Sequence, residues 1–270
     1  MLMMLAIPRS AAFAIVLCCA WVSSAFAGDD PRPCRTQSDL THLTYSLPRT
    51  AKRLANREPL TIVALGSSST AGAGASSPDA TYPSRLAAAL KEHFPSNVIT
   101  VLNRGVNGED AREMLDRFDT SVAAEKPDLV LWQVGTNSVL SDKPLSPVGS
   151  LIREGVARIK ALGADVILID AQFAPRVLAK PKNEQMLNVL ATTAKETSVD
   201  LFPRFAVMRR WREIQNIPFE AFLSPDSLHM NDWSYACLAK LLGDAIVDAA
   251  TLTQPVANAN LHALRPPPLP

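Results

Sequence analysis

The chain has 270 residues, of which 27 are basic and 26 acidic, so its formal net charge is +1 at neutral pH. Such a balanced charge gives no electrostatic reason to expect binding to nucleic acid or to an anionic membrane surface. The roughly 190 residues between the first predicted strand and the last predicted helix fit one medium-sized domain.

The N-terminus carries the pattern of a cleavable signal peptide over residues 1–27. Arg9 precedes an apolar stretch at residues 11–22, and residues 25–27 form an Ala-Phe-Ala cleavage pattern. The apolar stretch is short for a membrane anchor. The sequence therefore predicts cleavage after Ala27, a periplasmic or secreted mature chain, and no membrane span in the mature form.

Two of the four cysteines, Cys18 and Cys19, lie in the predicted signal peptide, which leaves Cys34 and Cys237 in the mature chain. An even pair of cysteines in an oxidising compartment favours a disulfide bond. The bond would tie the N-terminal segment to the last helix. The alternative is a pair of free thiols, one of them buried.

Segments rich in proline flank the compact part of the chain. Residues 28–59 are expected to form an arm or a short helix packed outside the core. In this arm Ser38 is a candidate helix cap, and Pro48 would limit the helix. Residues 251–270 are interpreted as a Pro-rich C-terminal tail. The compact domain is therefore expected over residues 60–250.

Apolar runs and amphipathic segments alternate along this domain. The first run, residues 60–65, is apolar on both faces and ends at Gly66, which is typical of a buried parallel strand. The other predicted strands are residues 98–102, 129–134, 166–169 and 199–202, and the predicted helices are residues 82–94, 111–124, 148–162, 183–197, 206–214 and 233–250. This alternation predicts an α/β fold, a three-layer α/β/α sandwich with a central five-stranded parallel sheet.

Polar residues and glycines follow the first three strands. Ser68 lies in a turn rich in serine and glycine after the first strand, Gly108 follows the second, and Asn137 follows the third. Because the carboxyl ends of parallel strands meet at one edge of a sheet, these loops are expected to converge. Neither a phosphate-binding P-loop nor a G-x-S-x-G elbow is present. Taken by themselves, the serines could equally belong to a polar loop with a helix cap.

A further pair of polar residues precedes the last helix. Asp226 and His229 are three positions apart, so both side chains can point the same way if the segment coils. The carboxylate can then fix the imidazole tautomer and leave the other ring nitrogen free to take a proton from a serine. The four histidines show no metal-ligand spacing, so neither a metal nor another cofactor is expected.

Together, the four motifs resemble those of the SGNH hydrolases, also called the GDSL esterase/lipase superfamily. The family's G-D-S-x-x-x-G motif corresponds to residues 66–72, its N-x-x-x-x-G motif to 103–108, its G-x-N motif to 135–137 and its D-x-x-H motif to 226–229. The resemblance implies the flavodoxin-like SGNH hydrolase fold, with residues 60–250 as the catalytic domain.

The same resemblance implies roles for individual residues. Ser68 corresponds to the nucleophile, and His229 and Asp226 to its base and orienting carboxylate. The implied oxyanion hole consists of the backbone N–H groups of Ser68 and Gly108 and the side-chain amide of Asn137.

The chain also departs from the family pattern. Ser67 and Ser138 stand where the family often has aspartates, which affects the expected loop geometry and substrate more than the mechanism. Gly105 is an alternative oxyanion glycine, although the alignment of the motif favours Gly108.

These features predict a secreted serine esterase that hydrolyses a small acyl ester, with an acetyl group on a carbohydrate as the favoured substrate. An O-acyltransferase to a sugar hydroxyl and a non-catalytic module that binds a carbohydrate or a protein partner are the alternatives. Five aromatic residues either line an acyl or sugar pocket or pack in the core: Trp132, Phe173, Trp211, Trp233 and Tyr235.

Overall fold

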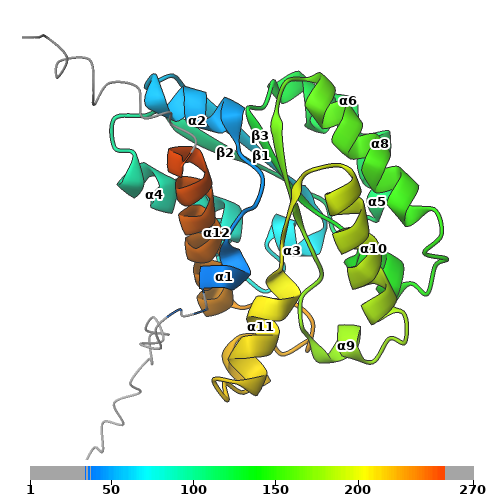
Figure 1. Cartoon of the computed structure of the whole chain (residues 1–270). Coiled ribbons are helices and arrows are strands. Elements are labelled where there is room, and N and C mark those ends of the chain that lie inside the picture. Colours follow the sequence, from blue (N-terminus) through cyan, green and yellow to red (C-terminus); the bar gives the residue numbers. More distant parts are fainter. Residues whose placement is uncertain (1–33, 35, 37, 253–270) are drawn as a thin grey trace, which may run out of the picture. The chain divides into compact units, whose positions relative to one another are not determined.

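The computed structural model describes residue 34, residue 36 and residues 38–252, and a five-stranded parallel sheet lies at its centre (Figure 1). The strand order is β2-β1-β3-β4-β5. The strands are β1 Leu60–Gly66, β2 Ile99–Gly105, β3 Leu129–Gln133, β4 Asp165–Ile169 and β5 Asp200–Phe202. The chain reverses its direction of winding between β1 and β3, and open parallel sheets bind ligands beyond the carboxyl ends of the strands at such a point. The predicted fold class is confirmed.

Helices cover both faces of the sheet: α2, α4 and α12 lie on one face, and α5, α6, α8 and α10 on the other (Figure 1). Alternate residues of β1 point to opposite layers, as a strand requires, so that Ile62 belongs to one buried cluster and Val63 to the other. The helices are α1 Ser38–Thr41, α2 Pro48–Ala55, α3 Ser68–Ala71, α4 Tyr82–His93, α5 Ala111–Asp116, α6 Phe118–Ser121, α7 Thr136–Leu140, α8 Val148–Ala161, α9 Pro175–Leu178, α10 Asn183–Glu196, α11 Arg204–Glu213 and α12 Asp232–Leu252, with 3-10 turns at Pro78–Ala80, Ala123–Glu125 and Phe219–Ala221.

One predicted helix is broken. The segment expected as a single helix over residues 111–124 forms α5, α6 and a 3-10 turn instead. Arg117 separates α5 from α6, and its guanidinium reaches the Glu109 carboxylate at 2.7 Å and the Arg104 carbonyl at 2.9 Å. These tertiary contacts override the helical pattern of the sequence.

The expectation that the segment before β1 packs outside the core is wrong. Leu43, Leu47 and Leu54 are buried and belong to the core cluster on the α12 side of the sheet. Pro48 begins α2 instead of limiting a helix before it. Proline suits the first helical position because its fixed φ angle is already helical and no N–H is needed there.

Two aspartates at the amino ends of strands hold this segment in place. Asp200 accepts hydrogen bonds from the backbone N–H groups of Thr44 at 2.7 Å and Tyr45 at 3.0 Å. Asp165 accepts from the backbone N–H and the hydroxyl of Thr50, both at 2.8 Å, in the first turn of α2. Burial raises the pKa of both carboxyl groups, against the effect of these donors.

A third aspartate, Asp128, lies just before β3 and is 3% exposed. It accepts hydrogen bonds from Arg49 Nε at 2.7 Å, Arg53 Nε at 2.9 Å and the backbone N–H of Thr61 at 3.0 Å. Burial opposes ionisation of Asp128, but the Thr61 N–H and the two guanidinium groups outweigh it and lower its pKa.

Replacing Asp128 by asparagine should therefore change how stability depends on pH. Its ionised form stabilises the fold above the pKa of about 3.9 in the unfolded chain, and this contribution is lost as the pH falls through the lower pKa of the folded state. We expect Asp128→Asn to be about 2 kcal/mol less stable at pH 7 and to approach the wild type below pH 4. Urea unfolding at pH 3 to 7 measures this difference.

The matched control is Asp119→Asn, because Asp119 is 84% exposed in its pair with Arg158 and should contribute little. A difference between Asp128→Asn and the wild type that stays constant with pH would contradict the assignment.

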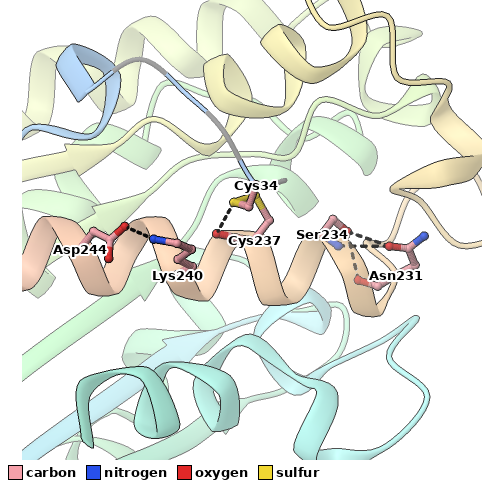
Figure 2. The surroundings of a disulfide bond; sticks show 6 residues. All are labelled: Cys34, Asn231, Ser234, Cys237, Lys240 and Asp244. Carbon is pink, nitrogen blue, oxygen red and sulfur yellow. Dashed lines mark hydrogen bonds and ion pairs between the residues drawn. A yellow bond between two sulfur atoms is a disulfide. The ribbon is translucent and has the colours of Figure 1, made fainter. Parts of the chain in front are cut away.

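The predicted disulfide is confirmed: Cys34 is bonded to Cys237 of α12, with a Cα–Cα distance of 5.3 Å (Figure 2). The two cysteines are 203 positions apart in the chain. The bond therefore closes a loop that contains the whole sheet. In residues 38–252, no helix combines the length and the hydrophobicity that a bilayer span requires.

The double variant Cys34→Ser/Cys237→Ser should be about 2–4 kcal/mol less stable than the wild type, because its unfolded state regains the freedom that the bond removes. Urea unfolding with and without a thiol reductant measures the effect. The reductant should lower the stability of the wild type to that of the variant and leave the variant unchanged. Equal stability of the oxidised wild type and the variant would contradict a stabilising role.

Candidate functional site

The turn after β1 places Ser68 at the first position of α3. Its conformation depends on Gly66, where a Cβ atom would lie 2.2 Å from the hydroxyl oxygen of Thr70. Both the backbone N–H and the hydroxyl of Ser67 donate to the buried amide oxygen of Gln133, each at 3.0 Å. Gln133 ends β3, the neighbouring strand, so the turn that presents Ser68 is held from within the sheet.

Asp226 organises the loop before α12. One oxygen of its carboxylate accepts hydrogen bonds from the backbone N–H groups of Leu228 at 3.0 Å and His229 at 2.9 Å, and from the hydroxyl of Ser224 at 2.7 Å. Burial opposes ionisation, but these donors and the His229 ring outweigh it and hold the pKa of Asp226 well below its usual range. Asp226 therefore stays ionised at neutral and mildly acidic pH.

The structure brings together the three residues for which the sequence predicts catalytic roles. Nδ1 of His229 faces the second carboxylate oxygen of Asp226, and Nε2 lies 2.8 Å from Oγ of Ser68. A neutral imidazole that donates from Nδ1 to the carboxylate has its lone pair on Nε2, directed at the serine hydroxyl. This arrangement can remove the proton of Ser68 as its oxygen attacks an electrophile.

The three predicted oxyanion donors, Ser68, Gly108 and Asn137, line one pocket together with His229. The side-chain amide of Asn137, in α7, donates to the Glu109 carbonyl at 2.8 Å, which fixes it beside the loop that carries Gly108. Within the described part of the chain, the backbone N–H groups of Ser68 and Gly108 donate to no protein acceptor. Such N–H groups are available to a ligand.

The two candidate glycines differ in their surroundings. A Cβ on Gly105 would lie 2.1 Å from the backbone nitrogen of Ala71, so this glycine lets β2 approach α3 closely. Gly108 has a φ of +84° and open space where a Cβ would be. Only Gly108 lines the pocket, in line with the alignment of the motif.

The pocket has a volume of about 460 Å³ and is lined mainly by polar and charged residues. None of the five aromatic residues singled out in the sequence lines it. Trp132, Trp211 and Tyr235 are fully buried, Phe173 is 5% exposed, and Trp233 packs against the core. Among the described residues, no group of three or more His, Cys, Asp or Glu side chains is placed to hold a metal ion.

A buried polar network below the pocket was not predicted. Gln172, just beyond β4, accepts hydrogen bonds from the Thr136 hydroxyl and from Nη2 of Arg204, both at 3.1 Å, and donates to the Leu228 carbonyl at 3.3 Å. Arg204 is 1% exposed. Burial raises the pKa of the adjacent Asp170 to about 7. Arg204 lies just before the predicted helix at residues 206–214, and no sequence pattern indicates that it is buried.

If the Asn137 amide donates to an oxyanion, as the motif predicts, Asn137→Ala should lower kcat for ester hydrolysis by about two to three orders of magnitude, while KM changes little. Steady-state kinetics, with thermal unfolding as a check on the fold, measure the effect. Asn188→Ala is the matched control, because Asn188 is exposed on α10 outside the pocket. An equal kcat for both variants would contradict the role of Asn137.

Comparison with known proteins identifies the family of this chain. A model of the Non-GDSL lipase-like family matches residues 33–252. The chain belongs to the Non-GDSL lipase-like family. This name agrees with the first motif, in which Ser67 replaces the aspartate of G-D-S. The resemblance to the SGNH hydrolases, inferred from four motifs, is confirmed.

The individual proteins that resemble this chain share less than a third of its residues over the aligned regions. An arylesterase of Vibrio mimicus is 28% identical over 124 residues, which are 46% of this chain and 60% of the relative. A two-domain esterase (CEX) active on acetylated mannans has a similar structure, with a TM-score of 0.70 at 19% identity over 87% of this chain and 62% of that one. The acetylxylan esterase Axe2 from Geobacillus stearothermophilus gives a TM-score of 0.58 at 22% identity over 69% of this chain and 94% of its own. At these identities the two structures show a shared fold.

Proposed function

We propose that this member of the Non-GDSL lipase-like family is a secreted serine esterase. It is a carboxylic ester hydrolase that removes a small acyl group, preferably acetyl, from a carbohydrate. The observation that carries the proposal is the 2.8 Å contact between Ser68 Oγ and His229 Nε2, with Asp226 on the other side of the imidazole. Such a base is what converts a serine hydroxyl into a nucleophile at neutral pH.

In the proposed reaction, Ser68 Oγ attacks the ester carbonyl carbon while His229 Nε2 takes the hydroxyl proton. The tetrahedral oxyanion accepts hydrogen bonds from the N–H groups of Ser68 and Gly108 and from the Asn137 amide. His229 then protonates the leaving alcohol, and the acyl group remains on Ser68. Water, deprotonated by His229, attacks this acyl-enzyme, and Ser68 leaves with the proton held by His229. Asp226 stays ionised and stabilises the imidazolium in both steps.

The relatives support the choice of substrate class. One structural neighbour is active on acetylated mannans and another is an acetylxylan esterase. Catalytic mutants of the latter replace a serine, an aspartate and a histidine, the same three residue types proposed here. The polar and charged residues among those that line the pocket can bind the hydroxyl groups of a carbohydrate.

We also propose secretion, with residues 1–27 as a signal peptide, residues 28–59 as the N-terminal segment, 60–250 as the catalytic domain and 251–270 as a tail. The Cys34–Cys237 disulfide supports an oxidising compartment. Residues 1–27 and most of the tail lie outside the described residues.

The test is hydrolysis of p-nitrophenyl acetate and butyrate, and release of acetate from acetylated xylan and mannan, by the wild type and Ser68→Ala. We expect activity in the wild type, a loss of at least about three orders of magnitude in the variant, and faster hydrolysis of acetate than of butyrate. Ser141→Ala keeps a serine-to-alanine change at the pocket without touching the proposed nucleophile, and should retain activity.

Inactivity of both wild type and Ser68→Ala toward every ester would contradict the esterase. Transfer of acetyl to an added sugar in preference to water would instead identify an acyltransferase. Binding of the polysaccharides without turnover would identify a carbohydrate-binding module.

A further inference from the structure

Arg176 is a cation at the proposed active site with no partner among the residues that the structure describes. It belongs to α9, is exposed, and lines the same pocket as Ser68 and His229. Within the described residues, its guanidinium makes no hydrogen bond and no ion pair. No step of the proposed hydrolytic mechanism uses this positive charge.

The other charged groups at the pocket have partners. Lys143 pairs with Asp110 at 2.6 Å. Asp226 is occupied by the His229 ring and by donors of its own loop. Among the residues that line the pocket, Arg176 therefore carries the positive charge that no carboxylate of the described residues pairs with. A little farther along the chain, Lys180 is likewise paired, with Asp142 at 2.6 Å.

The backbone around Arg176 is fixed relative to the proposed base. Pro175 opens α9, and the backbone N–H of Arg176 donates to the Ser227 carbonyl at 3.3 Å. Ser227 lies between Asp226 and His229, so the loop that positions the imidazole also positions the start of the arginine side chain. A side chain whose backbone is held in this way leaves less backbone freedom to be lost on binding a ligand than one on a mobile loop.

We propose that Arg176 binds a carboxylate of the substrate, so that the preferred esters of this enzyme are acidic, for example acetyl esters of uronic-acid-containing glycans. The inference rests on the proposed esterase function and adds the charge class of its substrate. Guanidinium is suited to this task because it is always charged and presents parallel N–H donors that match the two carboxylate oxygens. The carboxylate lies either on the alcohol or on the acyl side of the ester, and the test separates the two.

The test compares kcat/KM for two matched pairs of phenyl esters at pH 7. For the alcohol side, the pair is 4-acetoxybenzoate and its methyl ester; for the acyl side, it is phenyl hydrogen glutarate and phenyl valerate. Spontaneous hydrolysis, measured with Ser68→Ala, is subtracted. The quantity of interest is the ratio of kcat/KM for the acidic ester to that for the neutral ester, because comparing this ratio between variants cancels differences in intrinsic reactivity.

We expect Arg176→Gln to lower this ratio about 3- to 10-fold in at least one pair, with little change for the neutral esters, and Arg176→Lys to restore part of it. High salt should lower the ratio of the wild type toward that of Arg176→Gln, because it screens an exposed ion pair. The matched control is Arg209→Gln, which removes one positive charge from the exposed surface of α11 outside the pocket and should leave the ratio unchanged.

A ratio that is the same in Arg176→Gln and the wild type for both pairs, while the neutral esters are still hydrolysed through Ser68, would overturn this inference and leave the esterase intact. Equal reductions in Arg176→Gln and Arg209→Gln would also overturn it, since net charge would then explain the effect. A wild type no more active than Ser68→Ala toward all four esters would contradict the esterase itself.

Discussion

The amide oxygen of Gln133 is the contact on which the geometry of the site depends. It lies at the end of a central strand and accepts hydrogen bonds from the N–H and the hydroxyl of Ser67, at 3.0 Å each. Its residue is 1% exposed, so no water is available to replace it. The turn that carries Ser68 therefore cannot move away from β3 without leaving buried polar groups unpaired, at a cost of about 1–3 kcal/mol for each group.

Other buried polar contacts extend this constraint to the remaining loops at the rim. Tyr82 bonds to the hydroxyl of Thr70 at 3.1 Å, and the Tyr235 hydroxyl donates to the Ala73 carbonyl at 2.7 Å, so α4 and α12 both hold the segment after Ser68. Gln172 joins the loop of the G-x-N motif to the loop of His229. Asp226 and His229 lie on a loop and Ser68 begins a short helix, but the distances between them are supported by buried side chains of the neighbouring elements. Sites of this kind are more precise than their loop location suggests.

The sequence predicted the parts of this structure that local patterns encode. Runs of β-branched and aliphatic residues identified all five strands, and the motif spacing identified the residues that meet at the rim. It did not reveal Asp128, Asp165 and Asp200 as a set, because each is a single carboxylate whose donors lie 65 or more positions away in the chain. For the same reason it did not reveal Arg204: nothing local distinguishes a buried arginine from an exposed one.

The order of the elements along the chain has a consequence for how the protein is made. Ser68 and His229 are 161 positions apart, and α12 follows the His229 loop directly. A chain synthesised from its N-terminus contains the first motif long before it contains His229, the proposed base for the serine. The Cys34–Cys237 bond also becomes possible only when α12 is complete. Under the proposed mechanism, nascent or truncated chains that end before His229 therefore lack the base that activates Ser68. That base and the second cysteine of the disulfide are both added only after the whole sheet has been synthesised.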